Sequence, residues 1–126
     1  SVQKDTKVYE ALKIMSDRNI GSLVVLEGGK YAGILTERDY SRKVILEGRH
    51  SDEVTVGEIM SIDLPTVKPD DTVVLCMQLM SNKNIRYLPV FDGDHLSGII
   101  SISDVVTETI LQQKETISQL QNYIQG

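Results

Sequence analysis

The sequence predicts an α/β fold built from two tandem β-α-β-β-α repeats. Three observations lead to this prediction: the chain repeats itself at a fixed spacing, each copy alternates helix-like and strand-like patterns, and the length suits one compact body. With 126 residues, 40% hydrophobic and 25% charged, the composition is that of a globular protein. No apolar run approaches the ~20 residues needed to cross a bilayer, and the polar first ten residues do not form a signal peptide.

The repeat is the most informative feature. Residues 5–46 align without a gap on residues 70–111, an offset of 65, with 14 identical positions among 42. Chance would give roughly two or three at this composition. Identities such as Gly33/Gly98 and Asp39/Asp104 are joined by conservative pairs such as Thr36/Ser101. The pattern indicates a tandem duplication.

Each copy predicts the same elements in the same order. Apolar residues recur at helical spacing, a strand follows, a glycine-containing turn leads to a second strand that ends in Gly-apolar-apolar, and a second helix starts at a hydroxyl residue. A short extended piece around 66–67 precedes the second copy, and its counterpart lies at Val2. In the first copy we expect a helix at 8–15, a strand at 22–26, a turn at 27–30, a strand end at 33–35 and a second helix from Thr36. In the second copy the same elements are expected at 73–80, 87–91, 92–95, 98–100 and from Ser101.

We therefore divide the chain into a first repeat at 1–50, a linker at 51–64, a second repeat at 65–112 and a C-terminal helical extension at 113–126. A repeat of about 45 residues is too small to be comfortably stable alone. The two repeats are expected to pack sheet to sheet with pseudo-twofold symmetry. Along the final helix, Ile110, Ile117 and Ile124 are spaced seven apart, which suits packing on the chain's own body or, as we favour, on a second subunit.

The junction between the second strand and the second helix carries the candidate chemistry. Thr36 or Ser101 opens the helix, and Asp39 or Asp104 follows three residues later. One interpretation is a capping box that needs no ligand. The other is a nucleotide site, because a helix N-terminus suits a phosphate and a carboxylate can accept two hydrogen bonds from a ribose diol.

Nearby residues fit the second interpretation. Arg38 and Ser103 lie between hydroxyl and carboxylate, and Arg86 precedes a strand; a guanidinium fork suits phosphate oxygens. The residues alone do not decide between the capping box and the nucleotide site. Hydroxyl and carboxylate at one helix start point to a ribose-phosphate rather than to a free phosphate.

Two motifs, each present twice, resemble a known family. Asn-Ile-x-x-Leu-x-Val occurs at 19–25 and 84–90, and Gly, two apolar residues, Ser or Thr, two further residues and Asp occur at 33–39 and 98–104. In this order they resemble a cystathionine-β-synthase (CBS) domain pair, or Bateman module, of the small stand-alone kind. The resemblance covers nearly the whole chain.

The resemblance implies a regulatory, non-enzymatic module that binds an adenosine-containing ligand in two clefts. AMP is the first expectation, with ADP, ATP, NAD(H) and S-adenosylmethionine as alternatives. In each cleft the acid would hold ribose, the hydroxyl and its neighbour phosphate, and apolar residues adenine. One site would comprise Thr36, Arg38, Asp39, Leu64, Pro65, Ile85, Arg86, Tyr87 and Pro89, and the other Ser101, Ser103, Asp104, Val2, Ile20, Gly21 and Ser22.

The two sites are not equal in sequence. The first has Arg38 where the second has Ser103, and the second has Gly21 where the first has Arg86, so we expect the first to be better occupied. The competing interpretation is a protein-interaction or scaffold module whose clefts are vestigial.

Other function classes find little support. The net charge of −5 with no Trp disfavours nucleic acid. One cysteine and two separated histidines give no metal-ligand spacing, and no nucleophile and base form a recognisable pair. We expect no catalytic cofactor, no membrane partner, a homodimer formed through helices, and a downstream target protein that the sequence does not name. The single Cys76 has no partner in the chain, which favours the cytoplasm or another reducing compartment.

Overall fold

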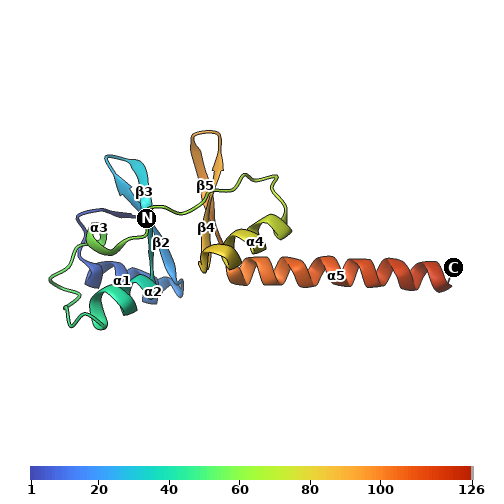
Figure 1. Ribbon diagram of the computed structural model, residues 1–126, viewed down its shortest axis with the longest axis horizontal. Helices are drawn as coiled ribbons and strands as arrows, with labels where there is room; N and C mark the ends of the chain where they lie inside the picture. Colours follow the sequence, from blue (N-terminus) through green and yellow to red (C-terminus); the bar gives the residue numbers. More distant parts are fainter. Residues whose placement is uncertain (126) are drawn as a thin grey trace. The chain divides into compact units, whose positions relative to one another are not determined.

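A computed structural model describes residues 1–125, with side chains to residue 113. The chain divides into two compact units, Ser1–Leu64 (unit 1) and Pro65–Gly126 (unit 2). The boundary coincides with the end of the predicted linker. Each unit contains the elements of one predicted repeat (Figure 1), which confirms the α/β fold with two β-α-β-β-α repeats.

Unit 1 is built on a three-stranded sheet in the order β1-β2-β3. Strand β1 runs parallel to β2, and β2 is antiparallel to β3. Side chains from helix α1 and from all three strands share one hydrophobic core, which also takes in Val54, Val56 and Ile59. The elements are β1 (Val2–Gln3), α1 (Val8–Arg18), β2 (Ser22–Glu27), β3 (Lys30–Thr36), α2 (Glu37–Tyr40), a π-helical turn η1 (Ser41–Ile45) and α3 (Val56–Ile59).

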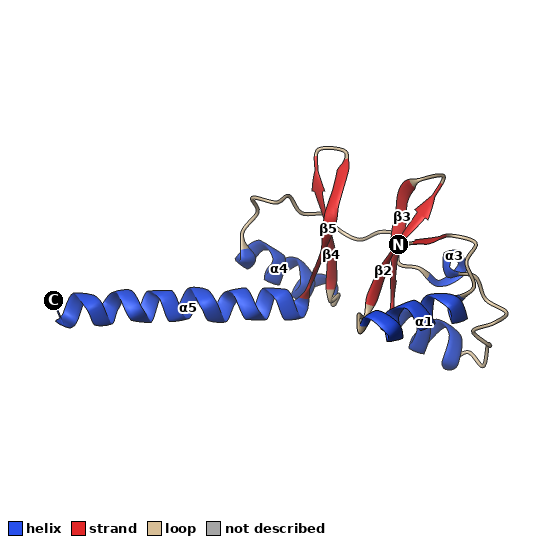
Figure 2. Cartoon of the chain, turned by 180° about the vertical axis from the view of Figure 1, so that it is seen from behind, coloured by secondary structure: helices blue, strands red, loops and turns tan. Residues whose placement is uncertain are grey.

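Unit 2 repeats this plan with two differences. An isolated parallel bridge between Val67 and Val90 takes the place of β1, and the second helix does not stop after a turn. Helix α5 runs beside α4 and continues past it (Figure 2). The elements are α4 (Val73–Lys83), β4 (Tyr87–Asp92), β5 (His95–Ser101) and α5 (Ile102–Gln125).

The sequence offset of 65 is preserved in the backbone. The helix ends at Asn19 and Asn84 both adopt a left-handed conformation with φ of 53°, which Asn tolerates better than most residues. The sheet irregularities between Val25 and Leu26 and between Val90 and Phe91 also correspond. The bridge of Val2 to Val25 matches that of Val67 to Val90, as the sequence predicted.

Each unit has its own core, and corresponding residues fill the two cores. Ala11 and Cys76 are buried on equivalent helices, as are Met15 and Met80, and Leu23 and Leu88. Cys76 is therefore a small core residue. Burial of such side chains stabilises each unit by about 25 cal/mol per Å² of apolar area.

The segment that follows α3 is held against β3 by a close backbone approach at Gly33. Ile34 and Ser61 exchange two backbone hydrogen bonds of 3.0 and 2.9 Å. A Cβ at position 33 would lie 2.6 Å from the Ser61 carbonyl oxygen, closer than real Cβ atoms come to any heavy atom. At the equivalent Gly98 an added Cβ meets nothing within 4 Å. Glycine is thus a packing requirement at position 33, and the described residues impose none at position 98.

This difference gives a matched prediction. Gly33→Ala should destabilise unit 1 by about 1–3 kcal/mol through overpacking, which lowers Tm by several degrees in a unit of this size. Gly98→Ala, at the equivalent strand position, should leave Tm nearly unchanged. Thermal unfolding followed by circular dichroism measures both, and equal Tm values for the two variants would contradict the packing role of Gly33.

Candidate functional site

In unit 1 the start of β2 lies beside the junction of β3 with α2. Ser22 pairs with Thr36 in the antiparallel register, and the Glu37 backbone N–H donates to the Gly21 carbonyl at 3.2 Å. The structure thus brings 20–22 next to 36–39. These two groups were assigned by the family resemblance to different sites.

Unit 2 has the same arrangement. Tyr87 pairs with Ser101, and the Ile102 backbone N–H donates to the Arg86 carbonyl at 2.8 Å. Residues 85–87 therefore lie next to 101–104. The remaining pairings, between predicted site residues of different units, stay predictions.

Both junctions contain the capping contacts expected from their spacing. In unit 1 the Asp39 backbone N–H donates to Thr36 Oγ1 and the Thr36 backbone N–H donates to Asp39 Oδ2, each at 3.0 Å. In unit 2 the Asp104 N–H donates to Ser101 Oγ at 3.1 Å and the Ser101 N–H donates to Asp104 Oδ2 at 2.8 Å. The capping interpretation is confirmed at both junctions, and capping alone does not exclude a ligand.

A third box of this kind begins α3. Thr55 donates from its backbone N–H (2.6 Å) and its hydroxyl (3.0 Å) to Glu58 Oε2. These hydrogen bonds, together with a contact from Arg49, hold the pKa of the Glu58 carboxyl below its usual value. The motif thus occurs in this chain at a helix start that the family resemblance does not associate with a ligand.

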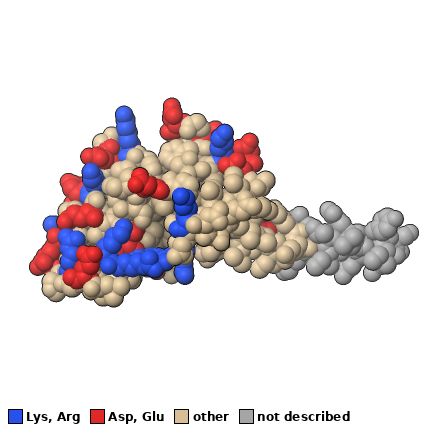
Figure 3. Space-filling model, in the orientation of Figure 1, with Lys and Arg blue, Asp and Glu red and all other residues tan. Residues whose placement is uncertain are grey.

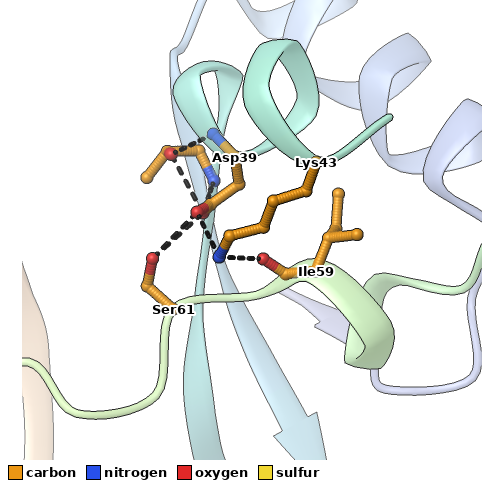
Figure 4. Close-up of polar contacts among 5 residues, drawn as sticks. Asp39, Lys43, Ile59 and Ser61 are labelled. Carbon is orange, nitrogen blue, oxygen red and sulfur yellow. Dashed lines mark hydrogen bonds and ion pairs between the residues drawn. The ribbon is translucent and has the colours of Figure 1, made fainter. Parts of the chain in front are cut away.

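The Asp39 carboxylate is buried and fully engaged inside unit 1 (Figure 4). Besides the Thr36 N–H, the Thr36 hydroxyl donates to Oδ2 at 3.0 Å. Lys43 Nζ donates to Oδ1 at 3.1 Å, and Ser61 Oγ lies 2.9 Å from Oδ1 and 3.2 Å from Oδ2. Lys43 also donates to the Ile59 carbonyl at 2.9 Å. Four donors therefore match the four lone pairs of the carboxylate.

Asp104 differs in both exposure and contacts. Its side chain is exposed, and among the described residues its carboxylate receives a hydrogen bond from the Ser101 N–H alone. The position equivalent to Lys43 is Glu108, whereas Ser61 lies outside the residues 5–46 that align with the second repeat. Equivalent motif residues thus have unequal surroundings.

The other predicted site residues vary in exposure. Val2 and Pro89 are buried, so their side chains contribute to packing. Arg86, Ser103 and Ile20 are exposed. The half-buried residues are Gly21, Ser22, Arg38, Leu64, Pro65, Ile85, Tyr87 and, at the junctions, Thr36 and Ser101.

Sequence reasoning missed Lys43 and Ser61. Lys43 is four residues after Asp39, a spacing that places the two side chains on one helix face, so it could have been found. Ser61 lies outside the aligned residues 5–46 and is 22 residues from Asp39. No pattern in the sequence pointed to it.

Each unit also has a surface hollow. In unit 2 a groove of about 500 Å³ lies between α4 and α5 and is mostly apolar, with Met77, Val106 and Ile110 along it and Ile85 and Arg86 at its edge. The face of unit 2 seen in Figure 3 carries few charged side chains, whereas both signs are interspersed over unit 1. In unit 1 a hollow of about 570 Å³ is lined by residues of 3–5, 26–28 and 55–58, none of which belongs to the predicted sites.

The model of one protein family, the CBS domain, matches residues 1–45 and 56–110. The chain belongs to the CBS domain family. A curated relative, the mitochondrial CBS domain-containing protein CBSX3 of Arabidopsis thaliana, is 43% identical over 127 residues, which is 97% of this chain and 62% of that protein. The chain thus spans somewhat less than two thirds of this relative's length.

Solved structures of CBS proteins are similar to this chain in sequence and in fold. A candidate signal-transduction protein with CBS domains from Burkholderia ambifaria is 45% identical, with a TM-score of 0.85 over 90% of this chain and 83% of that one. The CBS domain pair of protein MJ0100, in complex with 5′-methylthioadenosine and S-adenosyl-L-methionine, is 27% identical, with a TM-score of 0.77 over 88% and 87%. A hexameric CBS-CP12 protein from bloom-forming cyanobacteria is 33% identical, with a TM-score of 0.75 over 84% and 62%.

The described part of this CBS pair contains no group of metal-ligating side chains. Within the described residues, no three His, Cys, Asp or Glu side chains gather in a way that could hold a metal ion. No described helix combines the length and apolar character that a membrane span requires. Burial, with a smaller contribution from Asp71, raises the pKa of the Cys76 thiol, so this cysteine is a poor nucleophile.

The raised thiol pKa gives a second prediction. Because the fold raises the thiol pKa, it favours the neutral thiol. The resulting stabilisation is complete below the unfolded-state pKa and is lost as the pH rises through the folded-state pKa. At pH 8, Cys76 in the native protein should react with 5,5′-dithiobis(2-nitrobenzoate) far more slowly than in 6 M urea. The release of thionitrobenzoate measures both rates, and comparable rates would show that Cys76 is accessible in the fold.

Proposed function

We propose that this CBS pair is a regulatory module that binds an adenosyl ligand, AMP first, with ADP, ATP, NAD(H) and S-adenosylmethionine as alternatives. The observation that carries the proposal is the repeated strand-to-helix junction, where a hydroxyl and a carboxylate meet at a helix start. The relative that holds 5′-methylthioadenosine and S-adenosylmethionine supports this ligand class. The signal-transduction role suggested for the Burkholderia relative supports regulation.

The chemistry suits a ribose-phosphate. A carboxylate accepts two hydrogen bonds from a cis-diol, while the helix N-terminus and a hydroxyl donor favour a nearby phosphate. Arg38 in unit 1 and Arg86 in unit 2 add a cationic fork near each junction. The ligand regulates if it binds one arrangement of the protein more tightly than another. The module needs no catalytic group for this role, and we propose that it is not an enzyme.

A ligand panel tests the proposal. The midpoint of thermal unfolding is measured with AMP, ADP, ATP, S-adenosylmethionine and NADH, with GTP as a matched control for the base. A ligand present at 100 times its Kd adds about 2.7 kcal/mol of stability, so one adenosyl ligand should raise Tm by several degrees and GTP should not. No shift with any adenosyl ligand would favour the scaffold function with vestigial clefts.

We also propose that the protein forms a homodimer through the α4–α5 face of unit 2. The groove there is mostly apolar, and Met77, Val106, Ile110 and Leu111 are 45–52% exposed, which is typical of a surface that another chain covers. The hexameric CBS-CP12 relative supports self-association. The stripe predicted at Ile117, Leu120 and Ile124 lies outside the residues whose side chains are described.

Two charge variants on α4 test the dimer. Met77→Glu introduces a carboxylate into the apolar groove and should shift the protein toward monomer in sedimentation velocity, since burial of an unpaired charge is costly. Gln78→Glu places the same charge on the same helix outside the groove and should leave the assembly unchanged. A Met77→Glu protein that sediments like the wild type would contradict this interface.

We also propose that the protein resides in a reducing compartment. A single reduced cysteine in the core of unit 2 suits the cytoplasm or another reducing compartment. The downstream target of this CBS pair would be a protein whose activity changes when the ligand binds to the pair.

A further inference from the structure

The hairpin turn of unit 2 contains the one place in the chain where an aspartate or asparagine precedes glycine. Strand β4 ends at Asp92 and β5 begins at His95, so that Gly93 and Asp94 form a two-residue turn. Asp92 pairs with His95 in the antiparallel register, and all of the residues from 92 to 95 are exposed. The turn lies at the end of the hairpin away from α5 (Figure 1), so the dimer face proposed above does not cover it.

The backbone amide of Gly93 is free to react. Its N–H donates none of the backbone hydrogen bonds found in the turns and loops of the described residues. A Cβ built at this position would meet no atom within 4 Å, and glycine has no side chain of its own to shield the nitrogen. The side-chain carboxyl group of Asp92 directly precedes this nitrogen. Closure of Asp92 Cγ onto it forms a five-membered ring.

The matching turn of unit 1 differs in one methylene group. Glu27 ends β2 and is followed by Gly28, whose φ of 58° is close to the 61° of Gly93. Because the glutamate side chain is one methylene longer, the same attack would have to close a six-membered ring, which is slower. The duplication therefore provides an internal control at a glycine of nearly equal φ.

From these observations we infer that Asp92 is a modification site, at which the aspartate isomerises to isoaspartate through a succinimide. The Gly93 nitrogen forms a bond to Asp92 Cγ, the Cγ–OH bond of the carboxylic acid breaks, and the hydroxyl group leaves with the amide proton as water. Water then adds to one of the two ring carbonyls. Addition at the former side-chain carbonyl restores aspartate, and addition at the main-chain carbonyl gives isoaspartate. No oxidant or cofactor takes part.

The product does not fit the turn in which it forms. The main chain of isoaspartate runs through Cβ and Cγ, so it is one methylene longer. Loop length selects the turn type in a hairpin, and the added atom disturbs the Asp92–His95 pair that closes this one. The next residue inward, Phe91, donates its N–H to the Val67 carbonyl at 2.8 Å. We therefore expect the modification to loosen residue 67 from β4 and to destabilise unit 2, whether or not a ligand is bound.

Ageing of the full chain tests the inference. The protein is kept for weeks in mildly acidic buffer, and isoaspartate is located by tandem mass spectrometry and counted with an isoaspartyl O-methyltransferase and labelled S-adenosylmethionine. Position 92 should carry several-fold more isoaspartate than any other aspartate or asparagine. Asp92→Glu should lose this signal, whereas Asp94→Glu, on the other side of Gly93, should keep it. Asp92→Asn should form the same product with loss of ammonia in place of water.

Thermal unfolding of the same samples gives a second measurement. The Tm of aged wild-type protein should fall below that of fresh protein, and the Tm of aged Asp92→Glu should not. Equal isoaspartate in the wild type and in Asp92→Glu would overturn the inference, as would isoaspartate at position 92 that forms only in urea-unfolded protein. An unchanged Tm in a sample that contains isoaspartate at position 92 would overturn the effect on the turn.

Discussion

The close approach of the segment 59–61 to strand β3 makes the two repeats chemically different. Gly33 allows the Ser61 backbone to exchange two hydrogen bonds with Ile34, and this brings the Ser61 hydroxyl to the Asp39 carboxylate. Lys43 completes the set and neutralises the charge of a buried acid, which would otherwise be costly to remove from water. Among the described residues, an added Cβ at Gly98 meets no atom within 4 Å, and the Asp104 carboxylate receives a hydrogen bond from the Ser101 N–H alone. A symmetric duplication therefore contains an asymmetric pair of junctions.

Much of the fold could be predicted because the duplication presents the same pattern of helix and strand residues twice. The helix Val8–Arg18 and its copy Val73–Lys83 begin and end 65 residues apart, and so do the hairpin strands. Even the two-residue strand at Val2 could be predicted, because Val67 made its role recognisable. Where the copies differ, the sequence predicted the helical extension that is part of Ile102–Gln125 but not the π-helical turn at Ser41–Ile45. Both second helices follow the same capping motif, and the spacing that makes them start does not decide where they end.

The candidate site was predictable in its residue types and not in its contacts. The spacing of Thr36 and Asp39 identified both the capping box and a candidate ribose-binding acid. Whether the acid retains free acceptors depends on Ser61, a residue distant in sequence and outside the aligned residues 5–46. A motif defines which groups are near one another, whereas the donors already bound to them decide which ligand can bind. This is why two copies of the motif have different chemistry.

The proposed regulatory function depends on an adenosyl ligand at a strand-to-helix junction. A crystal structure of the protein grown with AMP tests whether such a ligand binds there. The ribose hydroxyls should lie within hydrogen-bonding distance of the Asp39 or the Asp104 carboxylate. A ribose that contacts neither carboxylate, or crystals that bind no nucleotide, would contradict the proposal.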